Sequence, residues 1–114
     1  MQRFGLAVQL QSDKVDEYRH NHERVWPEVE ARFKKVGFRE LDLFLHGDTA
    51  FLFLIYEGSL SLREALAQYA DDPRIQEWEA LNARCKAVVD HATDNGFSVL
   101  ESLYHFSTLD DRSL

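Results

Sequence analysis

Seven consecutive apolar residues at positions 50–56 (Ala-Phe-Leu-Phe-Leu-Ile-Tyr) restrict the fold of this 114-residue chain more than any other feature. Because the side chains of a strand alternate between the two faces of a sheet, a strand of this composition is expected to be buried on both faces. A short turn at Gly47 and Asp48 precedes it, and residues 38–46 before that turn alternate leucines with acidic side chains. The pattern predicts a hairpin of two strands.

A long amphipathic segment precedes the hairpin. Residues 13–36 carry an apolar stripe at helical spacing, with Pro27 in its middle. Proline lacks an N–H and biases the preceding residue, Trp26, away from helical angles. We therefore expect either a kink at this point or a second helix that begins at Pro27, and we expect Gly37 to end the helix.

The remaining patterns complete the order of elements. Residues 3–10 and 97–106 alternate as strands do, whereas residues 60–69 and a segment that opens at Pro73 have helical periodicity. Strand, broken helix, two strands, helices and strand is the order of an α+β, ferredoxin-like antiparallel sheet with helices on one face. Helices then cover only one face of the strand at residues 50–56, so the open face should meet a second copy, and we expect a homodimer.

Length and charge limit the domain organisation and the partners. We expect a single domain over residues 1–107, followed by a tail at residues 108–114. The formal net charge of −7 disfavours binding to nucleic acid or to an anionic membrane surface. The first residues contain no basic segment followed by a long apolar run, so we expect no signal peptide, no membrane span and a cytoplasmic location. Cys85 is the single cysteine and cannot form an internal disulfide.

The most informative candidate site is a set of three side chains spaced four residues apart, Tyr18, His22 and Trp26. At about 100° per residue they would lie within roughly 80° of one another on one helical face. A histidine between two aromatic rings suits acid–base chemistry on a small ligand such as a sugar. The alternative is that all three side chains face the sheet as ordinary core residues.

No pattern points to a metal or a cofactor, and we expect neither. His20 and His22 are two residues apart and would point in different directions on a helix, and the other histidines lack the spacing of metal ligands. The five glycines do not cluster into a phosphate-binding loop.

A family resemblance rests on the run Tyr18-x3-His22-x3-Trp26-Pro27-Glu28 and on the later block Gln76-Glu77-Trp78. Over residues 3–106 the chain resembles the L-rhamnose mutarotase family. The resemblance implies a ferredoxin-like fold that forms a dimeric α/β barrel. It also implies that His22 is the catalytic acid and that Tyr18, Trp26 and Trp78 contact the sugar.

Two positions depart from the rhamnose-type pattern. Leu41 stands where that pattern has a tyrosine, and Glu77 stands where it has a tryptophan. Hydrogen-bonding groups in a pocket discriminate strongly between substrates, so we expect both positions to contact the substrate. The Glu-Trp form is similar to members associated with L-fucose, which leads us to expect a 6-deoxyhexose, L-fucose in preference to L-rhamnose.

Mutarotation suits this residue set chemically. The ring opens when its oxygen is protonated and the anomeric hydroxyl is deprotonated, so one acid and one base suffice without a cofactor. A histidine that titrates near neutrality can play both roles, and Glu28 or Glu77 could add a carboxylate. Two alternatives stay open: a cofactorless monooxygenase or haem-handling relative of the same fold, and a non-catalytic module that binds a small ligand.

Overall fold

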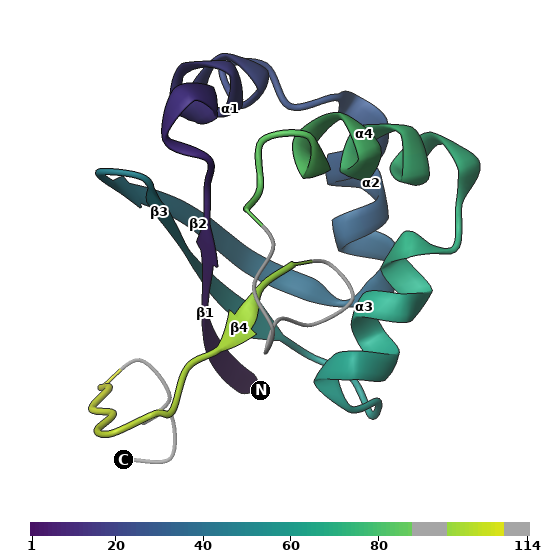
Figure 1. Cartoon of the computed structure of the whole chain (residues 1–114). Helices are drawn as coiled ribbons and strands as arrows, with labels where there is room; N and C mark the ends of the chain where they lie inside the picture. The colour runs from purple at the N-terminus through teal and green to yellow at the C-terminus, as the bar shows by residue number, and fades with distance from the viewer. Residues whose placement is uncertain (88–95, 109–114) are drawn as a thin grey trace.

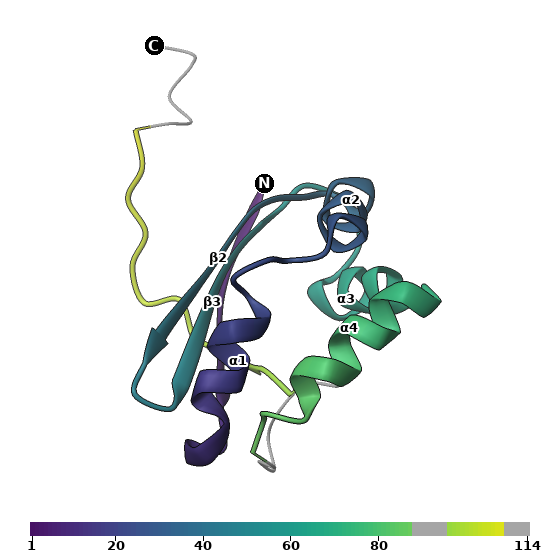
Figure 2. The same cartoon turned by 90° about the horizontal axis from the view of Figure 1, so that it is seen from above.

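The computed structural model describes residues 1–87 and 96–108. Its elements are β1 (Gln2–Gln9), a short 3-10 turn (Ser12–Lys14), α1 (Val15–Asn21), α2 (Pro27–Val36), β2 (Phe38–His46), β3 (Thr49–Tyr56), α3 (Leu62–Ala70), α4 (Pro73–Ala83) and β4 (Ser98–Val99). The strands pair antiparallel in the order β2-β3-β1-β4, and the helices lie on one side of the sheet (Figures 1 and 2). This confirms the predicted α+β, ferredoxin-like fold. No helix in the described ranges has the length and apolar character needed to cross a membrane.

The break in the first helical segment is longer than a kink. Trp26 has extended backbone angles (φ −61°, ψ 138°), and Pro27 opens α2 as its first residue, as the sequence indicated. However, α1 already ends at Asn21, and His22 is its C-cap. The expectation that Tyr18, His22 and Trp26 share one helical face is therefore wrong, because the chain is not helical between His22 and Trp26.

Gly37 links α2 to the sheet through a left-handed conformation. Its φ is 100°, and its N–H donates to the carbonyl of Lys34 at 3.3 Å. A side chain at this position would also collide with the backbone carbonyl of Glu57. Glycine meets both demands without strain, and this explains why the chain can turn here directly from α2 into β2.

Local capping signals fix the starts of the last two helices. The Ser61 side chain accepts from the N–H of Glu64, and the Glu64 carboxylate accepts from the N–H of Ser61, so a complete capping box opens α3. Asp72 caps α4 by accepting from the N–H of Arg74 at 2.9 Å, and Pro73 occupies the first helical position. Both helices were predicted, and both begin where capping residues stand.

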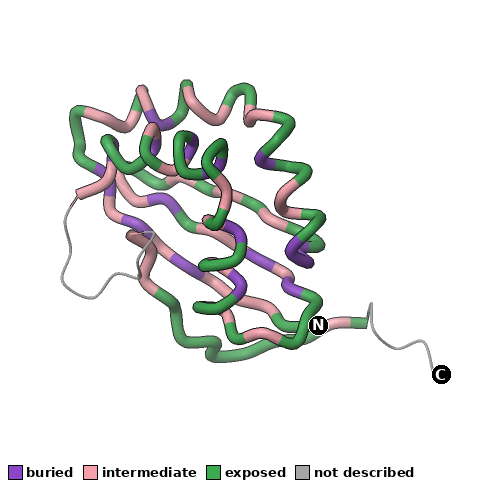
Figure 3. Tube along the Cα trace, turned by 90° about the vertical axis from the view of Figure 1, so that its right-hand side faces the viewer, coloured by how far each residue is buried: buried purple, intermediate pink, exposed green. Residues whose placement is uncertain are grey.

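The hydrophobic core lies between the sheet and the helices, where the buried stretches of strand and helix face one another (Figure 3). On β3, the side chains of Ala50, Leu54 and Tyr56 face this core and are almost completely buried. No element within residues 1–87 and 96–108 covers the opposite face of the sheet, and there Phe51 is 37% exposed and Phe44 on β2 is 60% exposed. Burial of residues 50–56 is therefore confirmed on the helix-covered face, and burial of the other face stays a prediction that requires the expected second copy.

The predicted final strand is mostly unpaired. Only Ser98 and Val99 pair with β1, and the N–H of Leu100 adds one bond to the carbonyl of Gly5 at 2.8 Å. Beyond this point the chain leaves the sheet, and Leu103 is 92% exposed. Alternation in sequence indicates extended backbone, but it does not supply a neighbouring strand to pair with. Residues 109–114 of the expected tail lie outside the described residues.

Candidate active site

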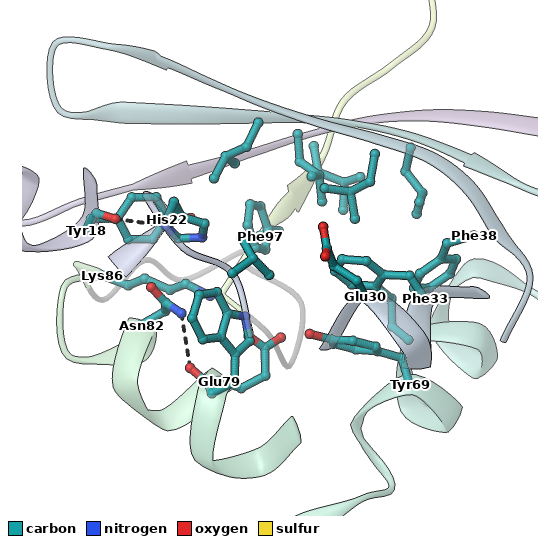
Figure 4. Close-up of a pocket in the computed structure, with 18 of the residues that line it drawn as sticks. Tyr18, His22, Glu30, Phe33, Phe38, Tyr69, Glu79, Asn82, Lys86 and Phe97 are labelled. Atoms are coloured by element: carbon teal, nitrogen blue, oxygen red, sulfur yellow. Dashed lines mark hydrogen bonds between the residues drawn. The ribbon is translucent and has the colours of Figure 1, made fainter. Parts of the chain in front are cut away.

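A cavity of about 490 Å³ lies between the sheet and the helices, within the size range of small-molecule sites. Its sheet side is aliphatic, with Leu6, Leu41, Leu43, Leu52 and Leu54. Its opposite side carries aromatic and polar groups, among them Tyr18, His22, Tyr69, Trp78, Glu79, Asn82 and Lys86 (Figure 4). One wall of the cavity is therefore aliphatic, whereas the other combines aromatic rings with hydrogen-bonding groups.

His22 enters this cavity from the end of α1. Its Nδ1 lies 2.8 Å from the backbone carbonyl oxygen of Tyr18. A carbonyl can only accept, so we assign the proton to Nδ1, and Nε2 keeps a free lone pair. Burial lowers the pKa of His22 below its ordinary value of 6.5, the nearby charge of Lys86 lowers it further, and the bond to Tyr18 opposes both effects. The imidazole is therefore neutral at neutral pH and can accept a proton.

Trp78 brings the aromatic side chains together. The Tyr18 and His22 rings lie 4.5 Å apart between centroids, and His22 meets the Trp78 ring edge-on at 5.3 Å. The rings of Trp26 and Trp78 lie 5.2 Å apart between centroids, and the guanidinium of Arg74 lies 3.7 Å from the centroid of the Trp26 ring. The predicted aromatic residues are therefore close together, but Trp78 on α4 is the ring that contacts both His22 and Trp26. Trp26 packs behind Trp78 and does not line the cavity.

The two positions that depart from the rhamnose-type pattern have different surroundings. Leu41 on β2 lines the cavity, as a substrate contact requires. Glu77 does not line it: the side chain is exposed and accepts from Arg74 Nη1 at 2.8 Å. Since successive helical residues are rotated by about 100°, the burial of Trp78 turns Glu77 outward. Glu28 is also exposed, 3.8 Å from Arg74, and neither carboxylate reaches the cavity.

Four charged residues that were not anticipated as site residues line the cavity, namely Glu30, Lys34, Glu79 and Lys86, and the last two have shifted pKa values. Glu79 on α4 has its pKa raised by burial, and the positive charge of Lys86 only partly offsets this. Lys86 has its pKa lowered by burial, and its Nζ lies 4.6 Å from the centre of the Phe97 ring. Buried positions on α4 and just after it follow at intervals of three and four, namely Ile75, Trp78, Asn82 and Cys85. This helical pattern of buried residues was visible in the sequence, and it places Glu79 next to the buried face of α4.

Asn82 ties this side of the cavity to α1. It is 3% exposed, its Nδ2 donates to the carbonyl of Trp78 at 3.1 Å, and its Oδ1 accepts from Asn21 Nδ2 at 3.2 Å. Asn21 is the last residue of α1 and directly precedes His22. The two amides therefore fix the position of the imidazole relative to Trp78. Within residues 1–87 and 96–108, no three His, Cys, Asp or Glu side chains gather as a metal-ligand set.

Curated proteins with related sequences are sugar mutarotases. The chain is 35% identical over 85 residues to the L-fucose mutarotase of Xanthomonas campestris pv. campestris, covering 71% of this chain and 68% of the relative. It is 30% identical over 83 residues to the L-rhamnose mutarotase of Burkholderia ambifaria, covering 73% of this chain and 78% of the relative.

Solved structures share the fold. The crystal structure of L-rhamnose mutarotase FA22100 from Formosa agariphila superposes with a TM-score of 0.70 at 19% identity, over 94% of this chain and all of that one. An antibiotic biosynthesis monooxygenase superposes with a TM-score of 0.58 at 10% identity, over 91% of this chain and all of that one, which shows likeness of fold alone. The L-rhamnose mutarotase family matches residues 3–106. Because this match spans nearly the whole chain, the protein belongs to the L-rhamnose mutarotase family and is an isomerase-type enzyme.

Proposed function

We propose that the protein interconverts the α and β anomers of a 6-deoxyhexose, L-fucose in preference to L-rhamnose, with His22 as an acid–base group. The observation that carries this proposal is the placement of His22. Its Nδ1 is engaged by the Tyr18 carbonyl at 2.8 Å, and its ring lines a cavity with one apolar and one polar wall. A neutral imidazole in this position can take up a proton and return it.

The proposed reaction follows from that protonation state. Nε2 of His22 accepts the proton of the anomeric hydroxyl while the ring oxygen is protonated, and the hemiacetal opens to the aldehyde. Rotation about the C1–C2 bond presents the other face of the carbonyl, and ring closure returns the proton from His22 to the carbonyl oxygen. The aromatic rings of Tyr18 and Trp78 would hold the sugar against the leucines of the sheet. This sequence of steps needs neither a metal nor a cofactor.

The preference for L-fucose is supported by Leu41 and by the relative from Xanthomonas, whose described activity is that of an L-fucose mutarotase. Leu41→Tyr places a hydroxyl at the sheet wall of the cavity. We expect this variant to change the ratio of L-fucose to L-rhamnose exchange rates by about tenfold or more, because an unmatched or newly matched hydrogen bond is worth about 1 to 3 kcal/mol. An unchanged ratio would show that position 41 does not read the sugar.

Saturation-transfer NMR of anomeric exchange tests the activity itself. L-fucose and L-rhamnose are each measured with the wild type, with His22→Ala and with His20→Ala as a matched control. His20 is exposed and pairs with Glu23 on the outside of the molecule, so its removal should leave exchange unchanged. The proposal requires that the wild type accelerate exchange and that His22→Ala fall to the spontaneous rate. Exchange at the spontaneous rate with the wild type on both sugars would refute it.

Neither alternative function has comparable support. The monooxygenase resemblance is one of fold, and the family assignment favours isomerase chemistry. A non-catalytic binding module would bind L-fucose without accelerating its anomeric exchange, so the same NMR experiment separates it from an enzyme.

We also propose that two chains associate through the open face of the sheet. This face presents Phe44 and Phe51 to solvent in the single chain, and the extended segment after β4 exposes Leu103, Tyr104 and Phe106 beside it. Apolar surface of this kind marks association sites. Light scattering should give about twice the 13.3 kDa mass of one chain, and Phe51→Asp should shift the mass towards that of the monomer. A monomeric wild type would overturn this proposal.

A further inference from the structure

The reaction proposed above needs two proton-transfer groups, and His22 is only one of them. The exposed carboxylates that sequence reasoning offered, Glu28 and Glu77, both lie near Arg74 outside the cavity. Glu79 is a different case, because it lines the same cavity as His22 (Figure 4). It follows Trp78, whose ring meets His22 at 5.3 Å.

The carboxylate of Glu79 has few interactions within the protein. Among residues 1–87 and 96–108 it forms no hydrogen bond or ion pair, and Lys86 affects it only through longer-range attraction. Glu79 is only partly buried, but a carboxylate with reduced access to water and no hydrogen-bonding partner still costs free energy, which a ligand in the cavity can recover. Its charge also raises the pKa of Tyr18, whose ring lies against His22, and that of Tyr69, which lines the same side of the cavity.

We propose that Glu79 is the second catalytic residue, which exchanges a proton with the ring oxygen of the sugar while His22 exchanges one with the anomeric oxygen. This inference rests on the proposed mutarotase function. Both groups line one cavity large enough for a monosaccharide, and they reach it from different elements, Glu79 from α4 and His22 from the end of α1. The scheme requires that one sugar contact both groups at once.

The proton balance closes without any further reactant. On ring opening, the O–H bond at C1 gives its proton to Nε2 of His22, the bond between C1 and the ring oxygen breaks, and the ring oxygen takes the proton of the Glu79 carboxyl. On closure, the new hydroxyl attacks C1, its proton returns to Glu79, and the imidazolium of His22 protonates the carbonyl oxygen. Each side chain ends in the state in which it began.

The surroundings shift the pKa values of both groups in the directions that this scheme requires. Burial lowers the pKa of His22 and raises the pKa of Glu79, so each shift favours the neutral form that the scheme assigns to that group. Lys86 lowers both pKa values, and its own pKa is lowered by burial. The other titratable groups that line the cavity are Tyr18 from α1, Glu30 and Lys34 from α2 and Tyr69 from α3.

Glu79→Gln tests the proposal because glutamine keeps the shape and removes the exchangeable carboxyl proton. Exchange of L-fucose should fall by about 10² to 10⁴-fold, the usual contribution of a positioned acid or base. Binding of L-fucose, measured by ligand-observed NMR, should stay within a few-fold. The pH profile of exchange should lose the limb that belongs to the carboxyl, an effect that a merely structural role would not produce. Glu57→Gln, at an exposed site paired with Arg39, serves as the charge-matched control.

If Glu79→Gln folds poorly, two further measurements can still test whether Glu79 exchanges a proton with the sugar. Glu79→Asp should retain the carboxyl limb of the pH profile at a reduced rate. In the wild type, the side-chain carboxyl ¹³C signal of Glu79 should titrate above an ordinary glutamate and shift when L-fucose is added.

If His22→Ala abolishes exchange while Glu79→Gln keeps the wild-type rate and pH profile, the role of Glu79 is refuted and the proposed function stands. If the wild type accelerates no exchange, both are refuted.

Discussion

Replacing Asn82 by alanine should destabilise the fold and disturb the position of His22. The side chain is 3% exposed and forms two hydrogen bonds, one to the Trp78 carbonyl and one from Asn21. At about 1 kcal/mol for each bond, the free energy of unfolding should fall by about 2 kcal/mol. For a domain of this size, that corresponds to a decrease in Tm of roughly 8 °C. Anomeric exchange should slow as well, because Asn21 directly precedes His22 at the end of α1.

Urea denaturation followed by circular dichroism measures this loss. Asn21→Ala is the matched comparison, since it removes only the shared bond and should cost about 1 kcal/mol. In the double variant the two losses should not add, and the difference should give a coupling free energy of about 1 kcal/mol. A cost below about 0.5 kcal/mol for Asn82→Ala, or fully additive losses, would show that the amide pair does not hold α1 in place.

Three further outcomes follow from the described geometry. The pKa of His22 is lowered in the folded protein, so between that pKa and 6.5 the unfolded chain binds more protons than the folded chain. The free energy of unfolding should therefore fall as the pH drops through this window, by at most about 1.4 kcal/mol per pH unit. Urea titrations at several pH values should show that His22→Ala removes this pH dependence. Gly37→Ala should cost more than the roughly 1 to 2 kcal/mol of the left-handed conformation, because its Cβ meets the Glu57 carbonyl, whereas Gly47→Ala has open space and should cost no more than that in the same assay. Asp72→Ala should lower the free energy of unfolding by about 1 kcal/mol through loss of the α4 cap, and no change would show that the cap is dispensable.

Local sequence signals were sufficient to predict most helix boundaries of the fold. Pro27 marked the start of α2, Gly37 its end and Asp72 the cap of α4, because each of these residues has a backbone preference that acts within one turn. The length of the final strand was overestimated, because strand pairing depends on residues that are distant in sequence. Pairing beyond Leu100 depends on which strand lies beside it, and no pattern within residues 97–106 encodes that neighbour.

The site was predictable as far as it depends on helical spacing. The Tyr18 and His22 pair was found because four residues make about one helical turn, and their rings do lie together. The sequence motif pointed to Glu77 and did not include Glu79, because a motif consists of neighbours in sequence, whereas only one face of α4 lines the cavity. Two positions along a helix are about 200° apart, so Glu77 faces solvent and Glu79 lines the cavity.

Both tryptophans of the chain, Trp26 and Trp78, belong to the aromatic cluster beside His22. All indole emission of the unlabelled protein therefore originates at one place. An imidazolium quenches indole fluorescence more strongly than a neutral imidazole does, so the emission intensity will follow the charge of His22 through the ring of Trp78. The fluorescence of this cluster can therefore be followed without any added label, and rapid mixing with each candidate sugar would test whether that sugar binds beside His22.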